Sequence, residues 1–228
     1  MLIGEEAFNK LQSAKVGIFG LGGVGSFAAE AIARAGVGEI DLFDGDVVDI
    51  TNINRQLVAL DDTVGRAKTE VMKERIEKIN KSAKVSSNSV FFDASNCNDY
   101  DFSGYSYVID AIDTVSSKLL IINKAFKAGV PIISSMGTAN KLNPCDLAVC
   151  DIYETENCPL ARVMRRELRK MKIERLKVVF SKEKPHFTPN ACDKNGKRIN
   201  SSISFVPPVA GFILASEVVK DIINKKGV

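Results

Sequence analysis

The stretch Lys15-Val-Gly-Ile-Phe-Gly20-Leu-Gly22-Gly23-Val-Gly25 decides the fold of this 228-residue chain. Its first six residues form a short apolar run, which is typical of a buried strand, and the alanine-rich residues 26–35 behind it predict a helix. The glycines satisfy the G-x-G-x-x-G pattern between a strand and a helix, which is the context that the pattern requires. Such a turn lets backbone N–H groups approach a phosphate at the positive end of the helix dipole. We therefore predict a phosphate site at Gly20, Gly22, Gly23 and Gly25; the alternative is a glycine-rich turn without a ligand.

Strands and helices alternate on both sides of this turn. The pattern predicts further strands over 39–44, 85–92, 105–112 and 130–136, and helices over 65–80 and 115–128, the last ending at Gly129. Such alternation predicts an α/β fold with a Rossmann-like, doubly wound, mostly parallel sheet. We assign residues 1–137 to this nucleotide-binding core.

Beyond residue 137 the alternation weakens. We expect strands over 147–152 and 177–181, helices over 159–171 and 209–223, and a long polar loop over 188–202. We interpret residues 138–228 as a substrate-binding extension of mixed strands and helices that completes the sheet. The whole chain, 1–228, is then a single domain of ordinary size.

Composition excludes several classes of protein. No apolar run approaches the roughly 18 residues needed to span a bilayer, and Glu5 and Glu6 argue against a secretory signal. We therefore expect a cytoplasmic protein without a membrane partner. The five cysteines are odd in number and form no Cys-x-x-Cys pair, so we expect neither a disulfide framework nor zinc.

Asp44 ends the second predicted strand, 19 residues after Gly25. An acid at this place holds ribose hydroxyls in dinucleotide-binding folds, and an ATP ribose would be held in the same way. Asp46 is a near alternative for this role. A solvated acid at the end of a strand is the simpler interpretation.

Cations follow the predicted ribose acid. Arg55 lies in the polar stretch after Asp44, and Arg66 and Lys68 lie at the start of the next predicted helix, where positive charge opposes the helix dipole. A bound triphosphate would remove this conflict, because Arg and Lys clamps suit phosphoryl charge. The alternative is that these cations lie on a solvated face.

Two acids, Asp110 and Asp113, lie at the end of the fourth predicted strand. Ligands bind at the carboxyl ends of strands in such sheets, and a carboxylate there could hold Mg²⁺ through its oxygens and water. For Asp113 the alternative is a role as helix N-cap, a frequent use of aspartate.

The order of these motifs resembles that of the ubiquitin-activating-like superfamily, whose bacterial members include the molybdopterin-synthase and thiamine-pathway adenylyltransferases. GLGGVG is followed by the ribose acid, by N-x-N-R-Q at 52–56, by VGRAK at 64–68 and by DAIDT at 110–114. The resemblance implies ATP as cofactor, with Asp44 on the ribose, Asn52, Arg55 and Lys68 on the phosphates, and Asp113 on Mg²⁺ and the reacting α-phosphate. It makes Arg55, Lys68 and Asp113 the catalytic residues.

Within the superfamily the chain is similar to the tRNA threonylcarbamoyladenosine dehydratases. The stretches that carry the likeness are RAGVGEIDLFDGDVVDITNINRQ, SSMGTANKLNP, CPLARVMRRELRK and SISFVPPVAGFILASEVVKDII. The resemblance implies ATP-dependent activation of a threonine carboxylate in a tRNA nucleoside, followed by ring closure with net loss of water. It also implies a homodimer, and we expect a sulfur-relay or redox protein among its partners. In the superfamily an N-terminal arm, which precedes the segment matching residues 2–4, brings an arginine across the dimer. We expect that here either another cation takes its place or the site is weakened, and that the stretch 184–202 differs in length from its counterpart in the family.

Charge is distributed unevenly. Residues 158–184 contain ten Lys or Arg and three acids, a net of +7, whereas the whole chain has +3 and the remainder therefore −4. A basic patch on an otherwise acidic protein suits a nucleic-acid backbone. The predicted tRNA-binding residues are Arg162, Arg165, Arg166, Arg169 and Lys170. The alternative is a solvated helix face.

Two rival functions stay open at this point. One is an adenylyltransferase that activates the C-terminal glycine of a sulfur-carrier protein; many such enzymes have the paired Cys-x-x-Cys motifs that are absent here. The other is a non-catalytic dinucleotide-binding sensor, which would need the glycines and Asp44 only. Cys158 could carry a thioester at a helix start, although a packing role is the simpler interpretation.

Overall fold

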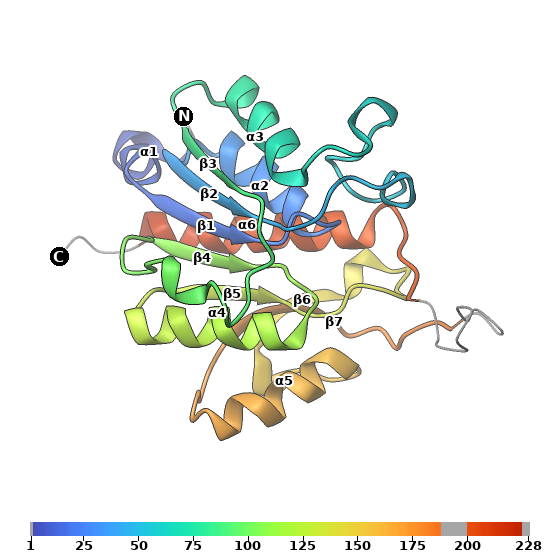
Figure 1. Ribbon diagram of the computed structural model, residues 1–228. Helices are drawn as coiled ribbons and strands as arrows, with labels where there is room; N and C mark the ends of the chain where they lie inside the picture. Colours follow the sequence, from blue (N-terminus) through green and yellow to red (C-terminus); the bar gives the residue numbers. More distant parts are fainter. Residues whose placement is uncertain (1, 188–199, 225–228) are drawn as a thin grey trace.

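The computed structural model describes residues 2–187 and 200–224, and its centre is a seven-stranded sheet (Figure 1). The spatial order of the strands is β3-β2-β1-β4-β5-β7-β6; all neighbours are parallel except β6, which runs antiparallel to β7. The strands are β1 (Lys15–Phe19), β2 (Glu39–Phe43), β3 (Lys84–Asn88), β4 (Tyr107–Asp110), β5 (Ile132–Ser135), β6 (Leu147–Asp151) and β7 (Lys177–Ser181). This confirms the predicted doubly wound, mostly parallel sheet.

Helices cover both faces of the sheet. In Figure 1, α1, α2, α3 and α6 lie together on one side, whereas α4 and α5 lie on the other. The helices are α1 (Gly4–Gln12), α2 (Gly25–Arg34), α3 (Lys68–Ile79), α4 (Val115–Ala128), α5 (Pro159–Lys170) and α6 (Val206–Asn224). Short 3-10 turns at 50–52, 61–63, 97–99, 144–146 and 152–154 join them.

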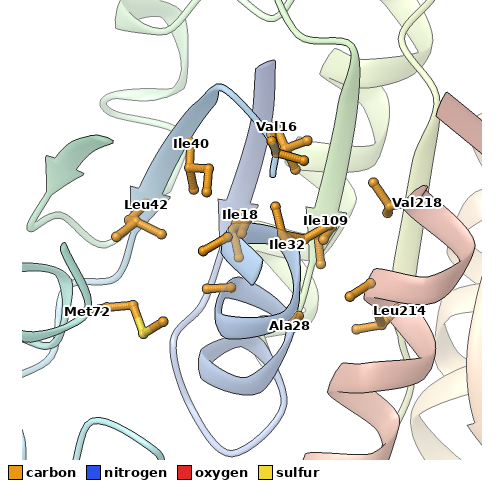
Figure 2. Packing of buried hydrophobic residues seen from close by; sticks show 14 of the residues in the cluster. Val16, Ile18, Ala28, Ile32, Ile40, Leu42, Met72, Ile109, Leu214 and Val218 are labelled. Carbon is orange, nitrogen blue, oxygen red and sulfur yellow. The ribbon is translucent and has the colours of Figure 1, made fainter. Parts of the chain in front are cut away.

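Successive residues of the strands point to opposite faces and so supply two cores. Towards α2, α3 and α6, buried aliphatic side chains of the strands meet those of the helices (Figure 2). The labelled members are Val16, Ile18, Ala28, Ile32, Ile40, Leu42, Met72, Ile109, Leu214 and Val218. Towards α4 and α5, the core contains an aromatic cluster: the rings of Phe19 and Phe43 stack with centroids 4.3 Å apart, and Phe92 and Phe102 contact the Phe19 ring. Both layers fix the ends of the strands rigidly.

The segment after residue 137 extends the same sheet. β7 pairs with β5 and β6 with β7, so the two last strands form one edge of the sheet, as expected for a completing extension. α6 then crosses behind the sheet and packs against α2 and α1. Among the described residues, no helix is both long and apolar enough to cross a membrane.

The elements differ from the sequence predictions at several boundaries. α1 was not predicted, and its only buried residue is Leu11, which leaves little apolar periodicity. The helix expected from residue 65 begins at Lys68, because Gly65 has a φ of +86° and residues 65–67 pair with Val47 and Val48. α6 begins three residues earlier than expected, since proline is tolerated in a first helical turn. Most of the predicted loop 188–202 lies outside the described residues.

Candidate functional site

A cavity of about 860 Å³ opens at the carboxyl ends of β1, β2, β4 and β5. The order of strands reverses between β1 and β4, and ligands in open α/β sheets bind at this kind of switch point. The residues that follow the four strands, Gly20, Asp44, Ala111 and Met136, all line the cavity. The volume lies within the range of small-molecule sites.

The glycine turn forms one wall of the cavity. Gly20 has a φ of +90°, which favours glycine, and its N–H donates to the carbonyl of Phe43 over 2.7 Å. Of the four glycines predicted to bind phosphate, Gly20, Gly22 and Gly23 line the cavity, whereas Gly25 does not. Instead, Gly25 begins α2 with its Cα packed against the Gly20 carbonyl group. Because Gly25 has no Cβ, the start of α2 can lie this close to the glycine turn.

We expect Gly25→Ala to lower the free energy of unfolding by about 1–3 kcal/mol, the usual range for overpacking. A Cβ at this position would overlap the Gly20 carbonyl oxygen and lie 2.9 Å from its carbon. Gly22→Ala is the matched control, because its Cβ would lie no nearer than 3.9 Å to any neighbour. Urea denaturation of the two variants checks this; equal stability losses would show that the turn has room for a side chain.

Asp44 lies beside the glycine turn and lines the cavity, and its role as a ribose acid stays a prediction. Its Oδ2 accepts the Leu21 N–H over 2.6 Å and its Oδ1 accepts the Asp46 N–H over 2.8 Å. Burial raises the pKa of the Asp44 carboxyl above its ordinary value, although Lys68 and the two N–H groups act in the opposite direction. The carboxylate keeps further lone pairs for a ligand's hydroxyl groups.

The polar connection after β2 brings Asn52 and Arg55 to the cavity. Asp49 caps the short turn at 50–52: its carboxylate accepts the Thr51 N–H over 2.8 Å, while the Asn52 amide oxygen accepts the Asp49 N–H over 3.2 Å. This cap holds the turn in place. Arg55 follows the turn, and its guanidinium donates to the Thr51 carbonyl over 3.1 Å and to Asn54 Oδ1 over 2.9 Å. Asn52 and Arg55 both line the cavity.

Lys68 joins them as the first residue of α3. Its N–H donates to the Asp46 carbonyl, and its buried Nζ lies 2.7 Å from Asp46 Oδ2. The anion that relieves the conflict with the helix dipole is therefore Asp46, within the chain itself. Arg66 is exposed, pairs with Glu74 and does not line the cavity, so its solvated-face interpretation is confirmed.

The two acids after β4 have different environments. Asp113 is exposed and lines the cavity; its alternative role as helix N-cap is taken by Thr114. Asp110 is fully buried, with Oδ2 2.9 Å from Lys118 Nζ and 2.6 Å from the Ser134 hydroxyl. Asp110 is therefore not accessible to a ligand, whereas Asp113, the acid that the resemblance assigns to Mg²⁺, lines the cavity and its metal role stays a prediction. The difference arises because Asp110 is the last strand residue and points into the core.

The five predicted tRNA-binding residues lie on α5, away from the glycine turn. Arg162 is exposed, and Arg166 and Lys170 are exposed beside Glu167. Arg169 lies over the ring of Tyr153, 5.1 Å from its centroid. Arg165 differs, because it is partly buried and donates to the backbone and hydroxyl oxygens of Thr155. Four of the five side chains are thus exposed on one helix, whereas Arg165 ties that helix to Thr155.

Cys158 is the N-cap residue of α5. It is buried, and its Sγ accepts the Ala161 N–H over 3.4 Å. This geometry supports the packing interpretation over that of a reactive thiol. Within residues 2–187 and 200–224, no group of three or more His, Cys, Asp or Glu side chains gathers in a way that could hold a metal ion.

Some cavity residues were missed by the sequence interpretation. Phe91, Ser117 and Thr138 line it, as does Gln56, which was part of the N-x-N-R-Q motif but had no assigned role. The loop at 200–202 and the start of α6 also contribute, through Asn200, Ser202 and Pro207. No local pattern marks these residues, because they come from connections far apart in the sequence that only the folded chain brings together.

Comparison with known proteins agrees with this geometry. The model of the ThiF family matches residues 1–228. A tRNA threonylcarbamoyladenosine dehydratase of Bacillus subtilis is 42% identical over 235 residues, which cover 98% of this chain and 92% of that protein.

Solved structures give the same result. The structure of Escherichia coli tRNA N6-threonylcarbamoyladenosine dehydratase, TcdA, in complex with ATP is 36% identical, with a TM-score of 0.89, and the match covers 98% of this chain and 91% of that one. A structure of the same enzyme in complex with AMP has the same identity and TM-score, and the match covers 98% of this chain and 92% of that one.

Proposed function

The chain belongs to the ThiF family and, within it, to the tRNA threonylcarbamoyladenosine dehydratases, and we propose that it uses ATP to dehydrate and cyclise threonylcarbamoyladenosine in tRNA. The observation that carries the proposal is one cavity lined by Gly22, Asp44, Arg55, Lys68 and Asp113. A glycine turn, a ribose acid, two cations and an exposed acid are what an adenylating site needs.

ATP fits this cavity by the chemistry of its walls. The turn at Gly22 and Gly23 leaves the backbone open to phosphate oxygens, and α2 directs its N-terminus at the same place. Asp44 takes the ribose hydroxyls at the rim. Phe91, exposed at the edge of the cavity beside Gly45, adds an apolar surface of the kind on which a base packs.

The phosphates lie, in this proposal, between Asn52, Arg55 and Lys68. The two cations neutralise charge that develops during phosphoryl chemistry. Mg²⁺, held by Asp113 through its oxygens and water, would supply further neutralisation. The ion pair with Asp46 already orients the Lys68 side chain, so this side chain loses little conformational freedom when the nucleotide binds.

The reaction has two steps. First, an oxygen of the threonine carboxylate bonds to the α-phosphorus, and the bond to the departing pyrophosphate breaks. A nitrogen or oxygen of the carbamoyl group then attacks the activated carboxyl carbon, AMP leaves, and one proton is released to solvent. The product has lost one water, and proximity within one nucleoside supplies much of the rate.

The tRNA would bind along α5. Four exposed cations on this helix offer contacts to backbone phosphates. A homodimer and an additional sulfur-relay or redox protein partner are proposals that stand on the resemblance alone, as does the location in the cytoplasm.

We expect replacement of both Arg162 and Arg169 by glutamine to weaken tRNA binding. The slope of the logarithm of the binding constant against the logarithm of the salt concentration should become shallower by about one per arginine. Filter binding over a series of salt concentrations measures this. The matched control replaces Lys78, in the last turn of α3, and Lys81, just after that helix, in the same way; both are exposed. If the control changes the slope equally, α5 is not the tRNA surface.

An exchange assay distinguishes the proposed function from its main rival. Pyrophosphate should exchange into ATP when tRNA carrying threonylcarbamoyladenosine is present, because that substrate provides the attacking carboxylate. A sulfur-carrier protein with a C-terminal glycine should not stimulate exchange. The opposite result would favour the adenylyltransferase that activates a carrier protein.

A further inference from the structure

The N-terminus of α4 opens into the cavity without a side-chain cap. Three residues around its first turn, Asp113, Thr114 and Ser117, line the cavity. Thr114 holds the N-cap position, but its side chain accepts no backbone N–H of this 14-residue helix. Within the described residues, the N–H groups of residues 115–117 donate to no group of the protein. The positive end of the helix dipole is therefore open to an anion.

Ser117, in the first turn, brings a hydroxyl to this helix end. The residue is only 9% exposed, and its hydroxyl has no hydrogen-bond partner in the part of the chain that the structure describes. Ser26, in the first turn of α2, differs, because its hydroxyl donates to the Gly22 carbonyl over 2.7 Å, a bond that helical serines often make. A polar group that is buried, unpaired and in a cavity wall is explained by a ligand that completes its hydrogen bonds.

The switch point between β1 and β4 gives the cavity two sides. On the side of β1 and β2 lie the glycine turn with the α2 N-terminus, Arg55 and Lys68, which together suit a triphosphate. On the side of β4 and β5 lie the α4 N-terminus and residues 135–139. Lys118, although close in sequence, is fully buried and pairs with Asp110, so it brings no charge to the cavity surface. This second helix end thus offers neutral donors.

Neutral donors suit one anion of the proposed reaction better than the other. The triphosphate carries several charges, which cations offset. The acceptor carboxylate carries one charge and must attack phosphorus. Neutral donors orient it with weaker bonds than a cation would, so its electron pairs stay available. The helix dipole adds a partial positive charge of about one half at the same place. A carboxylate is therefore the anion that this helix end fits.

We infer that the α4 N-terminus binds the carboxylate that is adenylated, with the hydroxyl and backbone N–H of Ser117 as donors. One carboxylate oxygen is held by the helix end, and the other is left to bond the α-phosphorus. The exposed Asp113 carboxylate opposes an anion here, and the Mg²⁺ proposed for Asp113 would offset this charge. The inference rests on the proposed function and names the place of its substrate within the cavity.

Ser117→Ala tests the inference, because it removes the hydroxyl and brings in a residue that favours a helix. We expect kcat/KM for tRNA carrying threonylcarbamoyladenosine to fall about tenfold or more, as for a lost hydrogen bond to a charged group, while the Kd for ATP changes less than about twofold. The unfolding temperature should not fall, since the hydroxyl has no partner among the described residues. Steady-state kinetics at saturating ATP, isothermal titration with ATP and thermal unfolding give these readouts.

Ser116→Ala is the matched control. Ser116 precedes Ser117 in the same helical turn, but it is exposed and does not line the cavity, so its replacement should leave kcat/KM unchanged. A second probe is the threonylcarbamoyladenosine analogue with hydrogen in place of the carboxylate, used as an inhibitor. It should inhibit the parent and Ser117→Ala alike, because it lacks the group that Ser117 binds.

Any of four results would overturn the inference: unchanged kcat/KM with Ser117→Ala, an equal loss with Ser116→Ala, weaker inhibition of Ser117→Ala by the analogue, or an equal fall in affinity for ATP. The last result would assign the helix end to a phosphate or, with a lower unfolding temperature, Ser117 to the stability of the fold. If the parent protein with ATP leaves threonylcarbamoyladenosine in tRNA unchanged, the proposed function itself fails, and not merely this role of Ser117.

Discussion

Lys118→Met will lower the free energy of unfolding by about 3–5 kcal/mol, the cost of removing one partner of a buried ion pair. Lys118 is fully enclosed, and its Nζ lies 2.9 Å from Asp110 Oδ2. It also donates to the carbonyl oxygens of Ile112 and Ser135 over 2.8 and 2.9 Å. One ammonium group therefore serves three acceptors between β4, β5 and α4. Without it the Asp110 carboxylate stays buried without a counter-charge, although it keeps the Ser134 hydroxyl and the Ile112 N–H as donors, and two carbonyl groups each lose a donor.

Urea denaturation at neutral pH measures this loss. Lys127→Met is the matched control, because Lys127 is exposed on the last turn of the same helix and its removal should cost less than about 1 kcal/mol. If Lys118→Met is as stable as the control, the buried network does not hold the ends of β4 and β5. Since Ile112 and Ser135 line the cavity, the same change should also weaken nucleotide binding.

Arg55→Ala will lower kcat/KM for tRNA dehydration about 10- to 150-fold, which corresponds to about 1.5–3 kcal/mol of lost stabilisation. Arg55 lies in the cavity wall and is held by the Thr51 carbonyl and Asn54 Oδ1, so its position is fixed before the nucleotide binds. In the proposed reaction it faces the phosphates, where charge increases as pyrophosphate leaves. Steady-state kinetics at saturating ATP measures the effect.

Arg66→Ala is the control for this variant. Arg66 belongs to the same connection between β2 and α3, but it is exposed, pairs with Glu74 and lies outside the cavity. Its replacement should change kcat/KM by less than about twofold, since exposed ion pairs contribute little. Equal losses for the two arginines would mean that the charge of the connection matters and that Arg55 has no specific contact.

The sequence predicted the sheet well, because its signals are local. Residues 15–25 combine a buried strand, a glycine turn and a helix start in one continuous stretch, and the αL residue Gly129 ends α4 where expected. Boundaries failed where pairing over a distance decided them. The start of α3 depends on the bridge between Val47 and Ala67, which no local pattern predicts.

Within the site, residue type was easier to predict than environment. Asp110 and Asp113 are three residues apart and chemically identical, yet one is sealed in the core by Lys118 and the other faces the cavity. Likewise, Lys68 was expected to need an external anion, whereas Asp46, 22 residues away, already pairs with it. Such partners come from tertiary packing, which no local sequence pattern shows.

The central claim is the dehydration itself, and mass spectrometry of the nucleosides tests it most directly. The purified protein is incubated with ATP, Mg²⁺ and tRNA carrying threonylcarbamoyladenosine, and the tRNA is then digested and weighed as nucleosides. We predict that this nucleoside loses the mass of one water, only when ATP is present, and more slowly with Arg55→Ala. An unchanged mass while the protein binds ATP would contradict the proposed reaction.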